Sequence, residues 1–410
     1  MRDGGRIAAA LAVLADMESR HKPARLALKA WADGARYAGA KDRAFVSGLV
    51  LDVLRRRRSL AWRMDPGGDR ACVLAALRFV WDWPIERIEA ALAEDHGPGE
   101  LTPAEQALLI DPRPLESAPA AVRGDYPEWL EPHMIRVFGD GRASEGEALA
   151  CRAPVDLRVN TLKTDLPRAL KALEPFSPYA LERLPGAIRV DPPAASDRAP
   201  AVETAPEFER GWFEVQDLGS QVAAAMAGDI KGAQVLDFCA GGGGKTLALA
   251  AAMGATGQLY AYDADARRLT DTVRRAQRAG VRNLQVRSPI HKNVLAGLEG
   301  HMDLVFVDAP CTGSGTWRRH PDAKWRLSSE QLARRMAEQD AVLTAAAAYV
   351  KVGGRLIYVT CSLFAEENED RIAEFLAPRT GFEAVGAPLR LTPRADGCDG
   401  FFVVILRRVG

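Results

Sequence analysis

Apolar residues recur at intervals of three and four through residues 7–92, as in Phe45, Leu49, Val50 and Val53, and β-branched runs are rare. This spacing gives each segment one apolar face and predicts several packed helices. Residues 95–145 are instead rich in proline, glycine and acidic residues, which predicts short helices joined by loops.

A different pattern begins after residue 150. The pattern predicts a strand at residues 157–162 (LRVNTL), a helix at 166–173 and a second strand at 187–190 (AIRV). These segments predict a small α/β module that precedes Trp212.

From residue 235 onward, apolar strand segments alternate with helical ones. The expected strands are VLDF (235–238), QLYAYD (258–263), LQVR (284–287), DLVFVDAP (303–310) and RLIYVT (355–360), and the expected helices start at Thr246 and Ala266 and span 329–349. This alternation predicts an α/β fold, a parallel sheet with helices on both faces and a ligand at the carboxyl ends of its strands. The final FFVVIL (401–406) is expected at the edge of the sheet, closing it.

The chain has 410 residues, of which 48 % are hydrophobic and 26 % charged. At about 100 to 200 residues per domain, this length predicts two or three domains with real cores. We place their boundaries at 1–145 for the helical domain, 146–228 for the small α/β module and 229–410 for the parallel sheet.

Charge is distributed unevenly along the chain. Lys+Arg and Asp+Glu are 54 each, so the net charge is zero, but residues 1–80 carry +8, 81–150 carry −10 and 231–335 carry +7. The two basic stretches could face a polyanion, with Arg55 to Arg58 and Arg318-Arg319 as candidate phosphate contacts. A solvated helix face is the alternative explanation for any one such run.

The cysteines and the apolar runs predict the compartment. The six cysteines are scattered singly, with no Cys-x-x-Cys pair, which is typical of a reducing cytosol and predicts no metal site. There is no uncharged run of about 18 apolar residues, and Asp3, Asp16 and Glu18 interrupt the N-terminal segment. We therefore expect a cytoplasmic protein without a membrane partner.

Residues 235–246 (VLDFCAGGGGKT) lead from a strand through a glycine loop into a helix. A phosphate-binding P-loop would need glycine where Cys239 stands, and the dinucleotide pattern fails because Thr246 follows Gly243 by three residues. The loop remains suited to close approach of a ligand to its backbone amides, although a purely structural turn is an alternative. Asp263, at the end of the next strand, could accept hydrogen bonds from both hydroxyls of a ribose.

Two cysteines follow neighbouring strands. Cys311 lies in Asp308-Ala309-Pro310-Cys311 and Cys361 in Thr360-Cys361-Ser362, so both are expected at the carboxyl edge of the sheet beside the ligand. An ordinary thiol, with a pKa of about 8.5, is mostly protonated at pH 7, so a nucleophilic cysteine needs activation by its surroundings. Lys245 is the candidate activator.

These motifs together resemble the Sun/Nop-type (RsmB-like) RNA cytosine-5 methyltransferases, which use S-adenosylmethionine (SAM). The similarity covers residues 152–402 and rests on RVNTLK (158–163), VQDLGSQ (215–221), DFCAGGGGKT (237–246), DAPCTGSGTWRRHPDAKW (308–325), VTCSLFAEENE (359–369) and DGFF (399–402). Residues 41–55 also resemble the NusB-like helical domain of the bacterial 16S rRNA members. The resemblance implies a Rossmann-like class I methyltransferase domain, preceded by an RRM-like α/β module and a NusB-like RNA-binding domain.

The resemblance also implies roles for individual residues. Cys361 would attack C6 of the target cytosine, Cys311 would assist release of the methylated base, Asp308 would hydrogen-bond N3 and Lys245 would contact the base. The implied SAM-binding residues are Cys239, Ala240, Gly241, Gly242, Gly243, Gly244, Lys245, Asp263, Arg268, Ser288 and Asp308.

The sequence departs from the family pattern at two places. Gly241-Gly242 stands where the family commonly has Ala-Pro, which should loosen the turn. Ser288 follows the third strand of the parallel sheet, where the family usually has an acidic residue that contacts adenine.

The expected function is therefore SAM-dependent methylation of a cytosine at C5 in RNA, with 16S rRNA as the substrate and a monomeric enzyme. A tRNA substrate and a non-catalytic, RNA-binding role in ribosome assembly are the alternatives. An amino-methyltransferase is disfavoured, because Asp308-Ala309-Pro310-Cys311 lacks the aromatic residue that would stack on the base.

Overall fold

The computed structural model describes residues 1–195, 197, 200–379 and 381–410, which form two compact units. The helical unit comprises Met1–Ala153, the described part of Pro192–Ala199, and Thr316–Leu327. The sheet unit comprises Pro154–Asp191, Pro200–Gly315 and Ser328–Gly410. The small α/β module and the parallel sheet belong to the same compact unit. The predicted division into three domains, with boundaries at 145 and 228, stays a prediction.

The helices predicted within 7–92 are present. The helical unit contains α1 (Asp3–Arg20), α2 (Ala24–Gly34), α3 (Ala40–Arg55), α4 (Arg57–Arg63), α5 (Asp69–Phe79), α6 (Ile85–Leu92), α7 (Pro103–Ile110), α8 (Ala120–Arg123), α9 (Glu131–Phe138), α10 (Arg142–Leu149) and α16 (Pro321–Arg326). Its apolar core draws on α1, α3 and α5, with fully buried side chains such as Ile7, Leu49 and Val73. Trp325, from the distant α16, packs against the same core.

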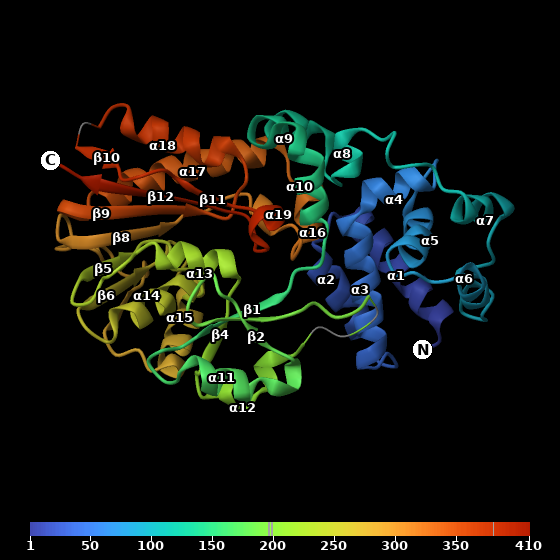
Figure 1. The fold of residues 1–410 in the computed structure, drawn as a ribbon, viewed down its shortest axis with the longest axis horizontal. Coiled ribbons are helices and arrows are strands. Elements are labelled where there is room, and N and C mark those ends of the chain that lie inside the picture. The colour runs from blue at the N-terminus through green and yellow to red at the C-terminus, as the bar shows by residue number, and fades with distance from the viewer. Residues whose placement is uncertain (196, 198–199, 380) are drawn as a thin grey trace. The chain divides into compact units, whose positions relative to one another are not determined.

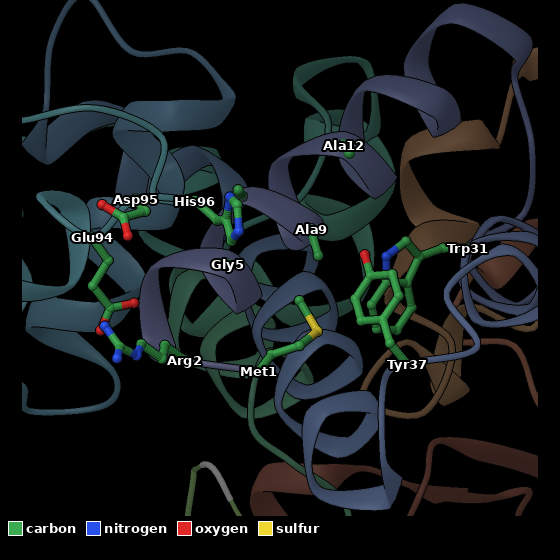
Figure 2. A pocket seen from close by; sticks show the side chains of 11 residues that line it. Met1, Arg2, Gly5, Ala9, Ala12, Trp31, Tyr37, Glu94, Asp95 and His96 are labelled. Carbon is green, nitrogen blue, oxygen red and sulfur yellow. The ribbon is translucent and has the colours of Figure 1, made fainter.

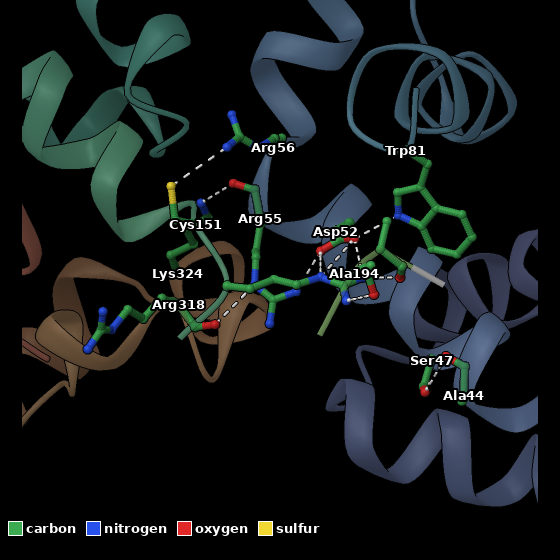
Figure 3. Close-up of polar contacts among 12 residues, drawn as sticks. Ala44, Ser47, Asp52, Arg55, Arg56, Trp81, Cys151, Ala194, Arg318 and Lys324 are labelled. Carbon is green, nitrogen blue, oxygen red and sulfur yellow. Dashed lines mark hydrogen bonds and ion pairs between the residues drawn. The ribbon is translucent and has the colours of Figure 1, made fainter. Parts of the chain in front are cut away.

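Polar contacts join α16 to the end of α3 (Figure 3). Lys324 Nζ donates to the carbonyl of Arg55 at 2.7 Å, and Trp325 Nε1 donates to the carbonyl of Leu54 at 2.6 Å. The last carbonyls of a helix have no partner inside it, so these two side chains satisfy groups that would otherwise be buried without a hydrogen bond. Segment 316–327 is therefore an integral part of the helical unit.

Arg55 is a buried structural residue, which contradicts its expected role as a phosphate contact. It is 8 % exposed, and its guanidinium donates to the carbonyl of Arg318 at 3.0 Å and to Asp52 at 2.8 Å. Asp52 also accepts from Trp81 Nε1 at 2.8 Å and pairs with Arg152 (Figure 3). Arg318 is 5 % exposed, so it too is an unsuitable phosphate contact.

The helical unit carries a pocket of about 1030 Å³ (Figure 2). Small residues of α1 form its floor, Trp31 and Tyr37 lie on one side, and Glu94 and Asp95 lie on the other.

The small α/β module is built on a four-stranded sheet in the order β2-β3-β1-β4. Its strands are β1 (Val155–Val159), β2 (Tyr179–Ala180), β3 (Ala187–Val190) and β4 (Phe213–Val215), with α11 (Leu166–Ala172) and α12 (Pro206–Glu209) between them. The described pairings are antiparallel, with Leu157 opposite Ile188 and Val215. Leu157, Ile188 and Phe213 are fully buried and centre the module's core.

Within the described residues, the large sheet has eight strands in the order β10-β12-β9-β8-β5-β6-β7, with β11 paired to β12. The strands are β5 (Gln234–Asp237), β6 (Gln258–Tyr262), β7 (Leu284–Arg287), β8 (Met302–Asp308), β9 (Val350–Thr360), β10 (Phe382–Ala384), β11 (Leu389–Leu391) and β12 (Phe401–Arg408). The strands from β9 through β8, β5 and β6 to β7 are parallel, as expected.

The prediction that 401–406 forms the edge of the sheet is wrong. The strand β12 runs antiparallel to β9 and is covered on its other side by β10 and β11. Its side chains from Phe401 to Val404 are buried, which is typical of an interior strand. The strands β10 and β11 have only three residues each, so their apolar pattern is too short to predict them from the sequence.

Helices cover both faces of the large sheet (Figure 1). Along β8, Leu304 and Phe306 pack with α13 (Leu218–Ala225) and α14 (Gly244–Met253), whereas Val305 and Val307 pack with α17 (Ser329–Ala347) and α18 (Glu369–Leu376). Alternate side chains of a strand point to opposite faces, so a continuous apolar run such as 304–307 is buried on both. The remaining helices are α15 (Ala266–Ala279) and α19 (Pro393–Asp396). Among the described residues, no helix has the length and apolar character needed to cross a bilayer.

The buried Lys324 leads to a prediction about stability and pH. Burial, together with the nearby charges of Arg55 and Arg56, lowers the pKa of Lys324 from 10.5 to about 7 against the opposing attraction of Asp125. Between about pH 7 and 10 the unfolded chain therefore binds more protons than the folded one, and the free energy of unfolding should rise with pH by up to about 1.4 kcal/mol per unit. Urea unfolding of the unaltered chain and of Lys324→Met across this range should show the rise only in the former. Parallel pH curves for the two proteins would contradict the assignment.

Candidate active site

The glycine loop connects β5 to α14 by a sharp turn. Gly241 and Gly243 have φ of 53° and 85°, a region that favours glycine, and the amide of Gly243 donates to the carbonyl of Ala240 at 2.9 Å. Beneath the loop, the fully buried Asp237 accepts a hydrogen bond from Thr246 Oγ1 at 2.6 Å. Burial raises the pKa of Asp237 to about 7. The start of α14 is thus tied to the end of β5.

Asp263 follows β6 and supports the loop. One of its carboxylate oxygens accepts from the amide of Gly241 at 2.8 Å, and the other accepts from the amide of Asp265 at 2.9 Å. Arg268, on α15, forms an ion pair with the same carboxylate at 3.3 Å. The predicted ribose ligand and the predicted Arg268 therefore lie together beside the glycine loop.

Lys245 and Asp308 form an ion pair at the carboxyl ends of β5 and β8. Their Nζ and Oδ2 atoms are 2.7 Å apart, with Lys245 8 % exposed. Burial alone would lower the pKa of Lys245, but the charge and hydrogen bond of Asp308, helped by Cys361, raise it. The side chain therefore holds a positive charge close to both Asp308 and Cys361.

The two predicted cysteines are adjacent. Their Sγ atoms are 3.3 Å apart, at the carboxyl ends of the paired strands β8 and β9. The hydrogen bond to Cys361, together with burial, raises the pKa of the Cys311 thiol well above its usual range. This effect keeps the proton on Cys311, so that its thiol can donate to the sulfur of Cys361.

A buried carboxylate that sequence reasoning missed holds the Cys311 loop. Glu367 accepts from the amide of Thr312 at 2.8 Å, from Thr312 Oγ1 at 2.5 Å and from Gln339 Nε2 at 3.0 Å. Gln339 Nε2 also donates to the carbonyl of Pro310 at 2.9 Å. The residues on both sides of Cys311 are thereby fixed to α17 and to the segment before α18.

A second network holds the loop of Cys361. Ser314 Oγ lies 3.1 Å from Ser362 Oγ and accepts from the amide of Leu363 at 2.8 Å. Asn368 bonds Thr360 Oγ1 at 2.5 Å and the carbonyl of Ser362 at 2.9 Å. Glu367 and Asn368 lie in the motif VTCSLFAEENE. Their polar side chains, close to Cys361 in the sequence, are the signal by which their role at the site could have been predicted.

The predicted site residues fall into two groups at one sheet edge. Lys245, Asp308, Cys311 and Cys361 are joined by the contacts just described. Asp263 and Arg268 adjoin the glycine loop formed by Cys239, Ala240, Gly241, Gly242, Gly243 and Gly244, in which Cys239 packs partly buried against the sheet core. Ser288 lies just beyond β7, where its carbonyl accepts from the amide of His291 at 3.3 Å. The assignment of each residue to catalysis or cofactor binding stays a prediction.

Comparison with known proteins identifies the family. Residues 229–407 match the family model described as 16S rRNA methyltransferase RsmB/F. The ribosomal RNA small subunit methyltransferase B of Erwinia tasmaniensis is 33 % identical over 397 residues, covering 89 % of this chain and 90 % of that protein. A probable ribosomal RNA small subunit methyltransferase B of Synechocystis sp. is 27 % identical over 414 residues, covering 90 % and 91 %.

A solved structure is similar in fold. The crystal structure of NSun6 from Pyrococcus horikoshii with SFG has a TM-score of 0.61 at 21 % identity, covering 69 % of this chain and 98 % of that one. The fold is Rossmann-like, as in other SAM-dependent methyltransferases. The chain belongs to the ribosomal RNA small subunit methyltransferase B family and is a SAM-dependent RNA methyltransferase that acts on rRNA.

Proposed function

We propose that this enzyme methylates C5 of a cytosine in 16S rRNA through a covalent bond between Cys361 and C6 of the base. The observation that carries the proposal is the pair of thiols 3.3 Å apart at adjacent strand ends, beside the ion pair of Lys245 and Asp308. An amino-methyltransferase would have no use for two thiols there. The names of the relatives favour rRNA over tRNA as the substrate.

The chemistry of cytosine explains the need for a nucleophile. C5 is a poor nucleophile, but addition of the Cys361 thiolate to C6 pushes the C5–C6 π electrons toward C5. Bound SAM supplies an electrophilic methyl group on its sulfonium centre. Once C5 has taken up that methyl group and its bond to the sulfonium sulfur has broken, loss of the C5 proton to water and elimination of the Cys361 sulfur restore the ring.

The neighbouring side chains have roles that suit this sequence of steps. The positive charge of Lys245, held beside Asp308, would stabilise the negative charge of the attacking Cys361 sulfur. Asp308 is proposed to donate a hydrogen bond to N3 as negative charge develops there, using a proton passed to it from the Lys245 ammonium 2.7 Å away. The protonated Cys311 would assist departure of Cys361 from C6.

The residues around the glycine loop suit SAM. The loop backbone would face the methionine end of the cofactor, with Arg268 and Asp308 close by, and Asp263 would accept from the ribose hydroxyls. Beyond Asp263, a hollow of about 570 Å³ is lined by apolar residues and by two charged ones: Ala264, Asp265, Ala266, Arg267, Pro289 and Ile290. We assign adenine to this hollow, with Ser288 at its margin, in place of recognition by an acidic residue directly after β7.

The helical unit and the small α/β module are proposed to bind rRNA, as a NusB-like domain and an RRM-like module would. With Arg55 buried, the basic candidates that remain near it are Arg56, Arg57 and Arg58, which pair in part with acidic neighbours such as Asp69 and Glu128. Mapping of 5-methylcytosine at base resolution in cells with and without the protein tests the substrate. An unchanged set of 5-methylcytosines in 16S rRNA would refute the proposed target.

The two cysteines should differ in the products that their variants leave. Cys361→Ala should abolish methyl transfer without trapping RNA, because no bond to C6 can form. Cys311→Ala should accumulate a protein–RNA adduct that survives denaturant, because release is impaired. Denaturing gels with radiolabelled RNA distinguish the two. Adducts with Cys361→Ala but not with Cys311→Ala would reverse the assignment.

Asp263→Ala should weaken SAM binding roughly 10- to 150-fold, the equivalent of about 1.5 to 3 kcal/mol of lost hydrogen bonding. Calorimetry measures the affinity, and Asp271→Ala, which removes an exposed carboxylate on the neighbouring helix, is the control. An unchanged affinity for Asp263→Ala would show that another residue holds the ribose.

Glu367→Gln should lower kcat about 10-fold or more while leaving SAM affinity unchanged. A neutral amide cannot accept from Thr312 and Gln339 at both of its ends, so the Cys311 loop loses a charge-assisted bond. Single-turnover methylation and calorimetry separate the two effects. Glu369→Gln, which removes a surface partner of Arg390, is the matched control. Equal kcat for Glu367→Gln and the control would refute the role of Glu367.

A further inference from the structure

We propose that Thr272 and Arg275, on one face of α15, are positioning residues that hold the glycine loop in its SAM-binding conformation before the cofactor arrives. The inference rests on the assignment of SAM to this loop. It concerns the free energy of ordering the loop rather than any contact with the ligand.

The loop needs external support because of its composition. Residues 241–244 are four consecutive glycines, with Gly241-Gly242 where the family commonly has Ala-Pro. Glycine loses more conformational freedom than any other residue when it is fixed, and proline loses little. Without restraint, a ligand would have to order this segment on binding, and its affinity would fall accordingly.

Side chains of α15 engage two successive carbonyls of the loop. Thr272, which is fully buried, donates from Oγ1 to the carbonyl of Gly241 at 2.8 Å. Arg275 donates from Nη1 to the carbonyl of Gly242 at 2.6 Å. Residues three apart lie on the same side of a helix, so one face of α15 holds both peptide groups. Asp263 holds the amide of Gly241 from β6.

Close packing accompanies these hydrogen bonds. A Cβ atom on Gly243 would lie 3.0 Å from Thr272, and one on Gly241 would lie 2.6 Å from Arg268. The helix therefore crowds a side chain at Gly243, whereas at Gly241 the contact is with the flexible end of Arg268 and the left-handed φ is the stronger restriction. Gly242 differs, because a Cβ there would meet Arg275 at an ordinary 3.7 Å and its φ is not left-handed.

Arg275 is itself anchored by the small α/β module. Its guanidinium pairs at 2.9 Å with Glu214 of β4, which is 2 % exposed and also pairs with Arg278 at 2.5 Å. The guanidinium of Arg278 lies 3.8 Å from the ring centre of Phe208. A single guanidinium thus links β4 to the carbonyl of Gly242, so the module proposed to bind rRNA also supports the cofactor loop.

The test is SAM affinity, measured by calorimetry on the full chain. Thr272→Val, which is nearly isosteric, should weaken binding roughly 2- to 10-fold through loss of one neutral hydrogen bond. Arg275→Met should weaken it roughly 10-fold or more, because the lost bond is charge-assisted. Arg274→Met is the matched control, since Arg274 lies one position away, is largely exposed and pairs only at the surface with Asp271.

A rescue variant distinguishes loop order from general damage. Gly242→Ala fits the observed backbone and restricts the unbound loop, so it should restore part of the affinity lost in Thr272→Val. Amide hydrogen exchange of peptide 239–246 in the ligand-free protein should be faster in Thr272→Val and slower again in the double variant. Arg275→Met also removes a partner from the buried Glu214, so Thr272→Val is the decisive variant.

Three results would overturn the proposal. These are an affinity of Thr272→Val equal to that of Arg274→Met, unchanged loop exchange in Thr272→Val, and no recovery with Gly242→Ala. Failure of the unaltered chain to bind SAM would instead overturn the assignment of the cofactor on which the inference rests.

Discussion

The parallel pairing of β8 with β5 on one side and β9 on the other is the constraint on which the rest of the site depends. In this register Asp237 lies opposite Phe306, and Asp308 lies opposite Val359. Because the three strands run in the same direction, the segments that follow them all emerge at one edge of the sheet. The fully buried run 304–307 holds β8 in place from both faces, so the strand ends that carry Lys245, Asp308, Cys311 and Cys361 have fixed positions.

The electrostatic surroundings give those side chains different charges and protonation states, and therefore different roles. A buried ammonium is costly unless it is paired, and Asp308 supplies the partner that keeps Lys245 charged. Cys311, half-buried against the neighbouring sulfur, retains its proton. The site thus combines a fixed cation, a carboxylate and a protonated thiol around Cys361, an arrangement that suits formation and later cleavage of a sulfur–carbon bond. Glu367 holds the loop of Cys311 and Asn368 holds the loop of Cys361, while Ser314 and Ser362 join the two loops to each other.

Much of this arrangement was predictable from sequence, because buried parallel strands and glycine-rich turns leave strong local signals. The strands that end at Asp237, Asp308 and Thr360 and the proximity of the two cysteines follow from such signals. The interior position of β12 did not follow, since β10 and β11 are only three residues each and their pairing is long-range. The burial of Arg55 was equally hidden, because its partner Arg318 is 263 residues away. Thr272 and Arg275 look like ordinary surface positions of a charged helix until the fold brings the loop against them.

The membership of segment 316–327 in the helical unit has a consequence for biosynthesis. The carbonyls at the end of α3 receive their hydrogen bonds from Lys324 and Trp325, which leave the ribosome roughly 270 residues later. The N-terminal unit therefore cannot complete its core while the chain is emerging, although domains usually fold in the order of synthesis. Nascent chains from which segment 316–327 has not yet emerged expose a helix end and part of an apolar surface, the kind of surface that chaperones bind. Because residues 316–327 complete the helical unit, neither unit can be exchanged with that of a relative by replacing one continuous N- or C-terminal segment.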